Sequence, residues 1–427
     1  MCKKLVRFTT HLISYTTMDE FVTIFNRVLL FGGITIFDKR NQNSKKWLVL
    51  QYINVFVGLL TFVFTSVFVL SNASDILLCI QGASIWITGV IMFISLTICL
   101  LFRKKFFAFL EEIVFVDLML EMPLIQHVCK MQVRRGRLRE LKELVISSHE
   151  KLLQLTTLLL RSYVASVWFS ATLYLCSPIY RMSLSNDKSL RLLAFDMWFP
   201  WGLENFTVYV ASFMFHAYAG YLCCVAYPGL QSMIILLVGQ VIRQLRILTF
   251  ILLHLDELVE ELVQEKKDLW QPGCTLILSQ CVDHYVKLKR FANRLNKITQ
   301  PFYLTLILVA SMLVCVCSVK IAISDRMSLD VMKYCVHEFC YTLVVLMFCF
   351  LGQKVDDECE KLEEAVTEKW YIYNSKHKVN VRIFKMAVSQ RMPIYIFGSV
   401  TLSLPTFTWF IKTGMSFFTL VMSVLNE

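Results

Sequence analysis

The 427-residue sequence lacks the short motifs that mark the common enzyme classes. It contains no HExxH, P-loop, HxxxxD or GxSxG pattern, and neither His216 nor His337 has a second ligand at metal spacing. Its 15 Cys residues form no CxxC pair and fall mostly in apolar runs, which argues against a disulfide framework or a thiolate metal site. We therefore predict a protein that is not an enzyme and uses no metal or cofactor.

Long apolar runs, by contrast, are abundant. Hydrophobic residues make up 56% of the chain and the mean hydropathy is +0.58, whereas a soluble domain rarely exceeds about 50% apolar residues. The first 30 residues hold Asp19, Glu20 and Arg27 and show no secretory signal peptide. Seven runs reach the roughly 20 residues that a bilayer span requires. We predict an all-α polytopic membrane protein with transmembrane helices at 47–71, 76–102, 158–180, 206–238, 301–323, 332–353 and 402–425.

The distribution of basic residues predicts the orientation of these helices. Most of the 43 Lys and Arg residues lie before the first span and between spans two and three, four and five, and six and seven. Cytoplasmic loops are enriched in Lys and Arg, so the N-terminus is predicted to be cytoplasmic and the C-terminus extracellular. Two glycosylation sequons, at Asn72 and Asn205, fall in loops that this assignment places outside the cell.

Three predicted cytoplasmic segments, 103–157, 239–300 and 354–401, are too long for structureless loops and show helical patterns. One of them carries a seam of residues at alternating steps of four and three, as in a heptad repeat. The seam consists of Ile277, Cys281, His284, Leu288, Phe291, Leu295 and Ile298. Two interpretations remain open: an intramolecular helix hairpin, or a domain below the membrane through which subunits contact one another.

Aromatic side chains are concentrated in the predicted outer halves of the spans. Belts at the membrane interface account for many Trp and Tyr residues, and a histidine bonded to a neighbouring helix is the simpler expectation for His216 and His337. The remaining aromatic residues predict an apolar pocket between helices, with room for a small, neutral ligand. The candidate lining residues are Trp86, Trp168, Tyr209, Phe213, Tyr334, His337 and Tyr341.

Four stretches resemble the insect odorant receptor family. The sequence MFCFLGQKVDDECEKLEEAVTEKWY (347–371) is similar to the family's end of helix six, and GSVTLSLPTFTWFIKTGMSFFTLVMSV (398–424) to its closing signature. LSQCVDHYVKLKRFANRL (278–295) resembles its Cys-x-x-His helix, and MWFPWGLENFTVY (197–209) the loop before helix four. The related gustatory receptors end in Thr-Tyr-x5-Gln-Phe, which is absent here. The chain also lacks the long insertion of the coreceptor between spans four and five, so it resembles a ligand-tuning subunit.

The resemblance implies an odorant-gated, non-selective cation channel: a heterotetramer with the coreceptor subunit, placed in the dendritic plasma membrane of olfactory neurons. The implied ligand is a small volatile odorant, and no nucleic acid takes part. Cytoplasmic ends of helices four to seven would form the anchor, and helix seven the pore. The positions that match the family's hydrophobic gate are Leu420 and Val424, near Ser416. The role of Lys412 stays open. Two alternatives are a gustatory-type channel of the same fold and an inverted seven-helix receptor without a pore.

These inferences divide the chain into six parts. A cytoplasmic N-terminal segment (1–46) precedes helices one to four, which hold the ligand pocket (47–238). An anchor segment (239–300), helices five and six (301–353) and a second anchor segment (354–401) follow. The predicted pore helix covers residues 402–427.

Overall fold

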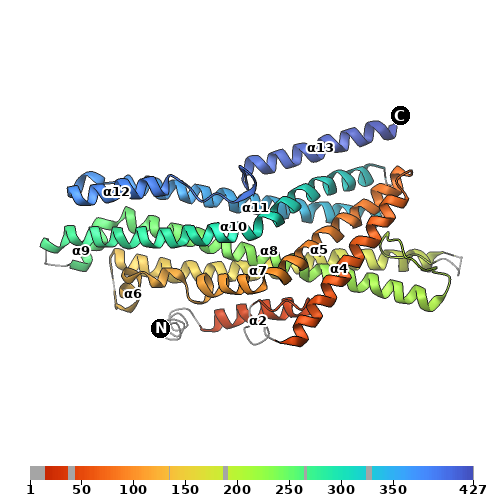
Figure 1. The fold of residues 1–427 in the computed structure, drawn as a ribbon, viewed down its shortest axis with the longest axis horizontal. Coiled ribbons are helices and arrows are strands. Elements are labelled where there is room, and N and C mark those ends of the chain that lie inside the picture. The colour runs from red at the N-terminus through yellow and green to blue at the C-terminus, as the bar shows by residue number, and fades with distance from the viewer. Residues whose placement is uncertain are drawn as a thin grey trace.

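The computed structural model describes residues 15–36, 44–133, 135–185, 191–263, 267–323 and 329–426 (Figure 1). In this part of the chain, almost all of the regular structure is helical. The elements are α2 (Tyr15–Phe31), α4 (Lys45–Ser71), α5 (Ile76–Leu110), the π-helix η1 (Glu111–Phe115), the 3-10 helix η2 (Leu118–Glu121), α6 (Pro123–Lys130), α7 (Arg137–Leu184), α8 (Phe206–Leu253), α9 (Leu255–Val263), the 3-10 helix η3 (Lys267–Leu269), α10 (Trp270–Ile323), α11 (Leu329–Thr367), the 3-10 helix η4 (Trp370–Ile372), α12 (Ser375–Val388), the strands β1 (Tyr395–Phe397) and β2 (Val400–Thr401), and α13 (Leu404–Asn426).

The seven predicted membrane-spanning helices are confirmed as α4, α5, α7, α8, α10, α11 and α13. Four of them are much longer than a bilayer requires: α7 and α8 have 48 residues each, α10 has 54 and α11 has 39. About 20 residues span the apolar core, so the excess extends beyond the membrane as continuous rods. α6, α9 and α12 gather around these extensions at one end of the molecule (Figure 1). The segments predicted to be helical below the membrane are therefore mostly direct continuations of the spans.

The seam on α10 is buried within its own chain. Leu288 and Phe291 are fully buried, and the ring of Phe291 lies 5.3 Å from that of Phe109 at the end of α5. Tyr285 packs 5.6 Å from Phe384 of α12. Of the two interpretations left open by the sequence, the structure shows the intramolecular one, because α5 and α12 already cover this face of α10.

Two elements were not predicted from the sequence. α2 lies in the N-terminal segment and buries Phe21, Phe25 and Leu29, which are four residues apart on one helical face. The second is the antiparallel hairpin of β1 and β2 within 354–401, a segment expected to be helical. Its turn contains Gly398 at a φ of +54°, a conformation that favours glycine. The hairpin reverses the chain directly before α13.

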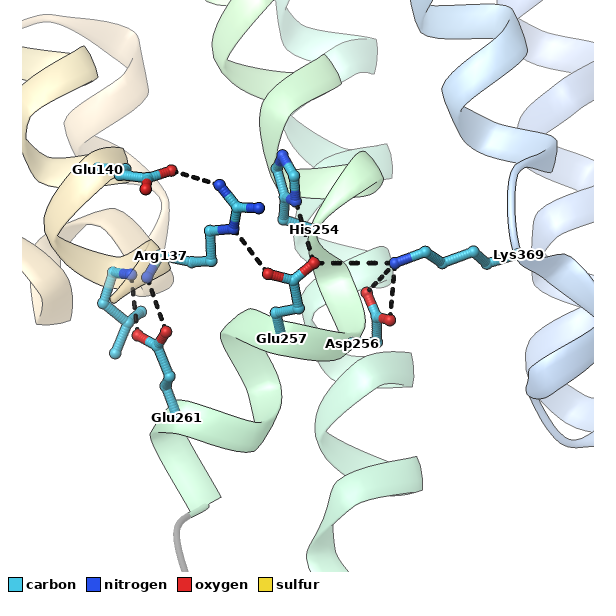
Figure 2. Close-up of polar contacts among 8 residues, drawn as sticks. Arg137, Glu140, His254, Asp256, Glu257, Glu261 and Lys369 are labelled. Atoms are coloured by element: carbon cyan, nitrogen blue, oxygen red, sulfur yellow. Dashed lines mark hydrogen bonds and ion pairs between the residues drawn. The ribbon is translucent and has the colours of Figure 1, made fainter. Parts of the chain in front are cut away.

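A charged network joins α7, α9 and the end of α11 (Figure 2). Arg137 contacts Glu257 at 2.6 Å, and Lys369 contacts Asp256 at 2.8 Å. Glu261 of α9 accepts hydrogen bonds from the first two backbone N–H groups of α7, at 2.7 and 3.0 Å, and so caps that helix. The hydrogen bond from Arg137 lowers the pKa of Glu257, which keeps this carboxylate charged. α9 is thereby held against two of the long helices.

Candidate ligand cavity and terminal helix

A cavity of about 80 Å³ lies between α4, α5, α7, α8 and α11. Its walls are mostly aromatic and apolar, and its lining holds no Asp, Glu, Lys or Arg side chain. The aromatic part of the wall consists of Tyr163, Tyr174, Phe195, Tyr227, His337 and Tyr341. The composition suits an uncharged, largely apolar molecule, because an unpaired charge would be expensive to bury there.

Small residues on facing helices leave the space open. Gly220 of α8 lies opposite Ala171 of α7, and a Cβ added at Gly220 would come within 3.2 Å of the Phe195 ring. Gly89 of α5 lines the same cavity. Larger side chains at these positions would occupy the volume that the surrounding rings enclose.

Buried polar atoms in the cavity wall, among them Nδ1 of His337, are available to a ligand. Nε2 of His337 lies 3.2 Å from Oγ1 of Thr88, and the Tyr227 hydroxyl donates to the Thr88 carbonyl oxygen. Nδ1 of His337 is buried and has no hydrogen-bond partner within the described part of the chain. Because a buried polar atom without a partner costs about 1–3 kcal/mol, a ligand that bonds to this nitrogen would recover part of that cost.

The loop that precedes α8 forms a roof over the cavity. Phe195 and Met197 of this loop line the cavity, and the Phe195 backbone N–H donates to Nδ1 of His216 at 3.2 Å. The indole N–H of Trp201 donates to Oγ of Ser212 at 3.0 Å. These bonds to α8 hold the roof in place, so His216 bonds to a loop rather than to a neighbouring helix.

The seven candidate lining residues separate into three groups. His337 and Tyr341 line the cavity, with their rings 5.3 Å apart on α11. Tyr334 lines a separate polar pocket on the outer side of the roof. The structure places the other four outside the cavity lining; they are Trp86, Trp168, Tyr209 and Phe213.

Each of these four has another environment. The indole N–H of Trp86 donates to Oγ of Ser66 at 2.8 Å, between α5 and α4. Trp168 is 54% exposed on the outer surface of α7. The Tyr209 hydroxyl donates to the Leu192 carbonyl oxygen at 2.9 Å and so anchors the roof loop, with Phe213 beside it. Position in a helix half that is predicted to be outer thus does not determine which way a ring faces.

The terminal helix α13 is the least covered of the spans. It packs on α10 and α11, and 11% of its most apolar stretch is buried (Figure 1). Phe410 is fully buried, and Gly414 lies against Val314 of α10. Lys412 and Ser416 are exposed. Lys412 lies roughly 160° around the helix from both of these residues, and Ser416 lies roughly 160° from Gly414 and 120° from Phe410.

The predicted gate residues lie on the uncovered part of α13. Leu420 is 59% exposed and Val424 is 51% exposed. The hydroxyls of Ser416 and Thr419 donate to carbonyl oxygens of their own helix at 2.9 Å each. A helix with this exposed mixture of apolar and polar groups requires either lipid or further protein around it.

Seven membrane-length helices, five of which line an apolar cavity, define a polytopic membrane protein with a site for a small molecule. The model of the 7tm Odorant receptor family matches residues 147–415, and the chain belongs to that family. The membership predicted from the sequence is confirmed.

Solved structures share the fold. The insect olfactory receptor OR5 from Machilis hrabei in complex with eugenol has a TM-score of 0.78 at 14% identity, covering 96% of this chain and 99% of that one. A structure described as that receptor, with no ligand named, has a TM-score of 0.77 at 14% identity and the same coverage. No match was found among curated proteins.

Proposed function

We propose that this chain is the odorant-sensing subunit of a ligand-gated, non-selective cation channel. The observation that carries the proposal is the apolar cavity, lined by no charged side chain, in a chain of the odorant receptor family. The similar Machilis hrabei structure contains eugenol, which makes that compound a suitable first probe. The proposed ligand is a small, neutral, mainly apolar volatile.

Apolar burial provides most of the binding free energy in such a cavity, at roughly 25 cal/mol per Å². His337 adds one hydrogen-bonding position through Nδ1, while Tyr341 and the other rings add contacts of about 0.5–1.5 kcal/mol each. A volume of about 80 Å³ is smaller than the roughly 150 Å³ of an engineered cavity that binds benzene. Binding of a typical odorant therefore requires wall side chains to move.

Filling the cavity is expected to weaken the response. Ala171→Leu places a branched side chain in the space beneath Phe195 and should raise the half-maximal odorant concentration about tenfold, equivalent to ~1.4 kcal/mol. The matched control is Ala165→Leu, at an exposed position on the same helix. The measurement is the odorant-evoked current of each variant co-expressed with a coreceptor. Equal shifts in both variants would contradict this location for the site.

For the pore, we propose that the uncovered face of α13 meets other subunits around a shared lumen. Lys412 and Ser416 lie on that face, and Leu420 and Val424 are the proposed hydrophobic gate. The support is that α13 packs on α10 and α11 and exposes most of its length. The proposed partner is the coreceptor, in a heterotetrameric complex that segments 239–300 and 354–401 would anchor.

Making the gate polar is expected to raise the current without odorant. Leu420→Ser lowers the cost of hydrating a dewetted constriction, so basal current should rise several-fold at unchanged surface expression. The control is Met415→Ser, which is also exposed but lies about 140° around the helix from Leu420. A basal current that rises equally in both variants, or in neither, would count against this gate.

For the orientation, we propose a cytoplasmic N-terminus in the plasma membrane. Asn205 is exposed at the start of α8, and Asn72 ends α4 at the same outer side as the roof loop. Both asparagines should carry glycans, and Asn72→Gln and Asn205→Gln should each remove one glycan in a gel-mobility assay. The control is digestion with a glycosidase, which should bring the wild type and both variants to one mobility. Absence of glycan at both sites, together with surface staining of an N-terminal tag on intact cells, would reverse the orientation.

A further inference from the structure

A second cavity, of about 480 Å³, opens on the membrane-facing side between α7 and α11. Its rim is formed by exposed apolar side chains, with Phe169 51%, Leu343 50% and Phe339 67% exposed. All three lie within helices of membrane-spanning length and composition. We call this cavity the lateral groove. In a bilayer its opening faces lipid tails.

The lateral groove and the ligand cavity share two wall residues. Tyr163 of α7 and Cys340 of α11 line both spaces, so these two side chains lie between them. Ser166 lies one turn from Tyr163 on the groove side, and Ser170 lies a further turn along on the cavity side. On the helix face of Tyr163, Ser166 is small, whereas Leu159 on the groove side and Val167 on the cavity side are larger. Rotation of this one ring would join the two spaces.

A route into the ligand cavity from the outer side would pass through a polar pocket rather than an apolar one. The polar pocket above the roof, of about 360 Å³, shares Tyr174, Phe195 and Met197 with the ligand cavity. Its lining includes Arg181, Arg191, Lys320 and Lys333. A neutral apolar molecule gains little in such a pocket. Passage would also require the roof to lift, which breaks the hydrogen bond between Phe195 and His216.

We propose that the ligand enters from the lipid phase through the lateral groove, and that Tyr163 with Cys340 forms the gate of this entrance. The inference rests on the function proposed above. Apolar molecules concentrate in the bilayer because transfer out of water is favourable. The same motion of Tyr163 enlarges the ligand cavity toward the range of about 300–1,000 Å³ that is usual for ligand sites. The motion of Tyr163 that admits the ligand therefore also makes room for it in the cavity.

Blocking the groove tests the inference without altering the cavity wall. Ser166→Trp and Leu343→Trp each place an indole at a position that lines only the groove. An obstruction at an entrance slows association and dissociation by the same factor. Both variants should therefore slow the onset and the washout of the eugenol-evoked current about tenfold, with an unchanged half-maximal concentration. Leu193→Trp, which lines only the outer pocket, is the matched control and should keep wild-type rates.

The measurement is current under rapid eugenol exchange, in cells that co-express a coreceptor, with surface biotinylation to confirm that each variant is present. Wild-type rates in both groove variants overturn the lateral entrance, as does slowing by Leu193→Trp alone. A shifted half-maximal concentration without a change in washout also overturns it, because the groove would then be part of the binding site. These outcomes leave the proposed function intact. If the wild-type complex gives no current with any compound of a neutral odorant panel, the proposed function fails, and the entrance with it.

Discussion

Replacing Asp117 by Ala is expected to remove most of the folded receptor. The guanidinium of Arg243, itself 4% exposed, contacts the Asp117 carboxylate at 2.6 Å. Nε of Arg243 also donates to Gln240 at 2.8 Å, but that amide carries no charge. Removing one partner of a buried ion pair leaves an uncompensated charge and costs roughly 3–5 kcal/mol. Since domains are stable by only about 5–15 kcal/mol, this is a large part of the total.

Asp117 also organises the backbone at the start of η2. It adopts a φ of +52°, and its Oδ1 accepts a hydrogen bond from the Met119 backbone N–H at 3.2 Å. Nδ1 of His149 lies 3.7 Å from Oδ2, so one carboxylate connects η2, α7 and α8. Burial would raise the pKa of this carboxyl, but Arg243 and His149 outweigh that effect and lower it. The stabilisation is therefore present above the unfolded pKa of about 3.9 and is lost as the pH falls through the lower folded value.

The effect of Asp117→Ala can be measured as the yield of monodisperse protein in detergent and its melting temperature. Asp283→Ala is the matched control, because Asp283 is exposed on α10. In the double variant Asp117→Ala/Arg243→Leu no charge is left unpaired, so part of the yield should return. Wild-type yield and melting temperature for Asp117→Ala alone would show that the pair is not essential to the fold.

The spans and the α10 seam could be predicted because their signal lies in local periodicity and length. Leu288 and Phe291 repeat with the period of a helix, whatever packs against them. α2 was overlooked because only one of its faces is apolar and it lies outside the long apolar runs. The hairpin before α13 has strands of three and two residues, too short for an alternating pattern to identify.

The cavity was only partly predictable because its lining depends on how each helix is rotated about its axis. Trp168 and Tyr341 are both aromatic residues in the helix halves that the sequence predicts to be outer, yet one is exposed and the other lines the cavity. His337 and Tyr341 share a face because they are four residues apart on α11. The overlooked residues Tyr163 and Tyr227 carried no comparable local signal. Gly220 and Ala171 define empty space only once α7 and α8 are packed together.

Replacing Gly352 by Ala is expected to uncouple the cavity from α13, the proposed pore helix. A Cβ added at Gly352 of α11 would lie 2.2 Å from the carbonyl oxygen and 2.6 Å from Cβ of Leu402. Leu402 cannot yield easily, because its backbone N–H donates to the Ile394 carbonyl oxygen at 2.8 Å and α13 begins two residues later. Ala gains up to ~1 kcal/mol of helix propensity over Gly, but a backbone overlap of this depth costs more.

The consequence for gating follows from the course of α11. His337 lines the cavity on the same helix, about 22 Å along its axis from Gly352 at 1.5 Å per residue. Gly352→Ala should therefore separate α11 from the start of α13 and reduce the odorant-evoked current per surface receptor at least tenfold. Gly202→Ala is the matched control, since a Cβ there meets nothing within 4 Å. The test divides the eugenol-evoked current by surface biotinylation for both variants. A wild-type ratio for Gly352→Ala would mean that the signal reaches α13 without this contact.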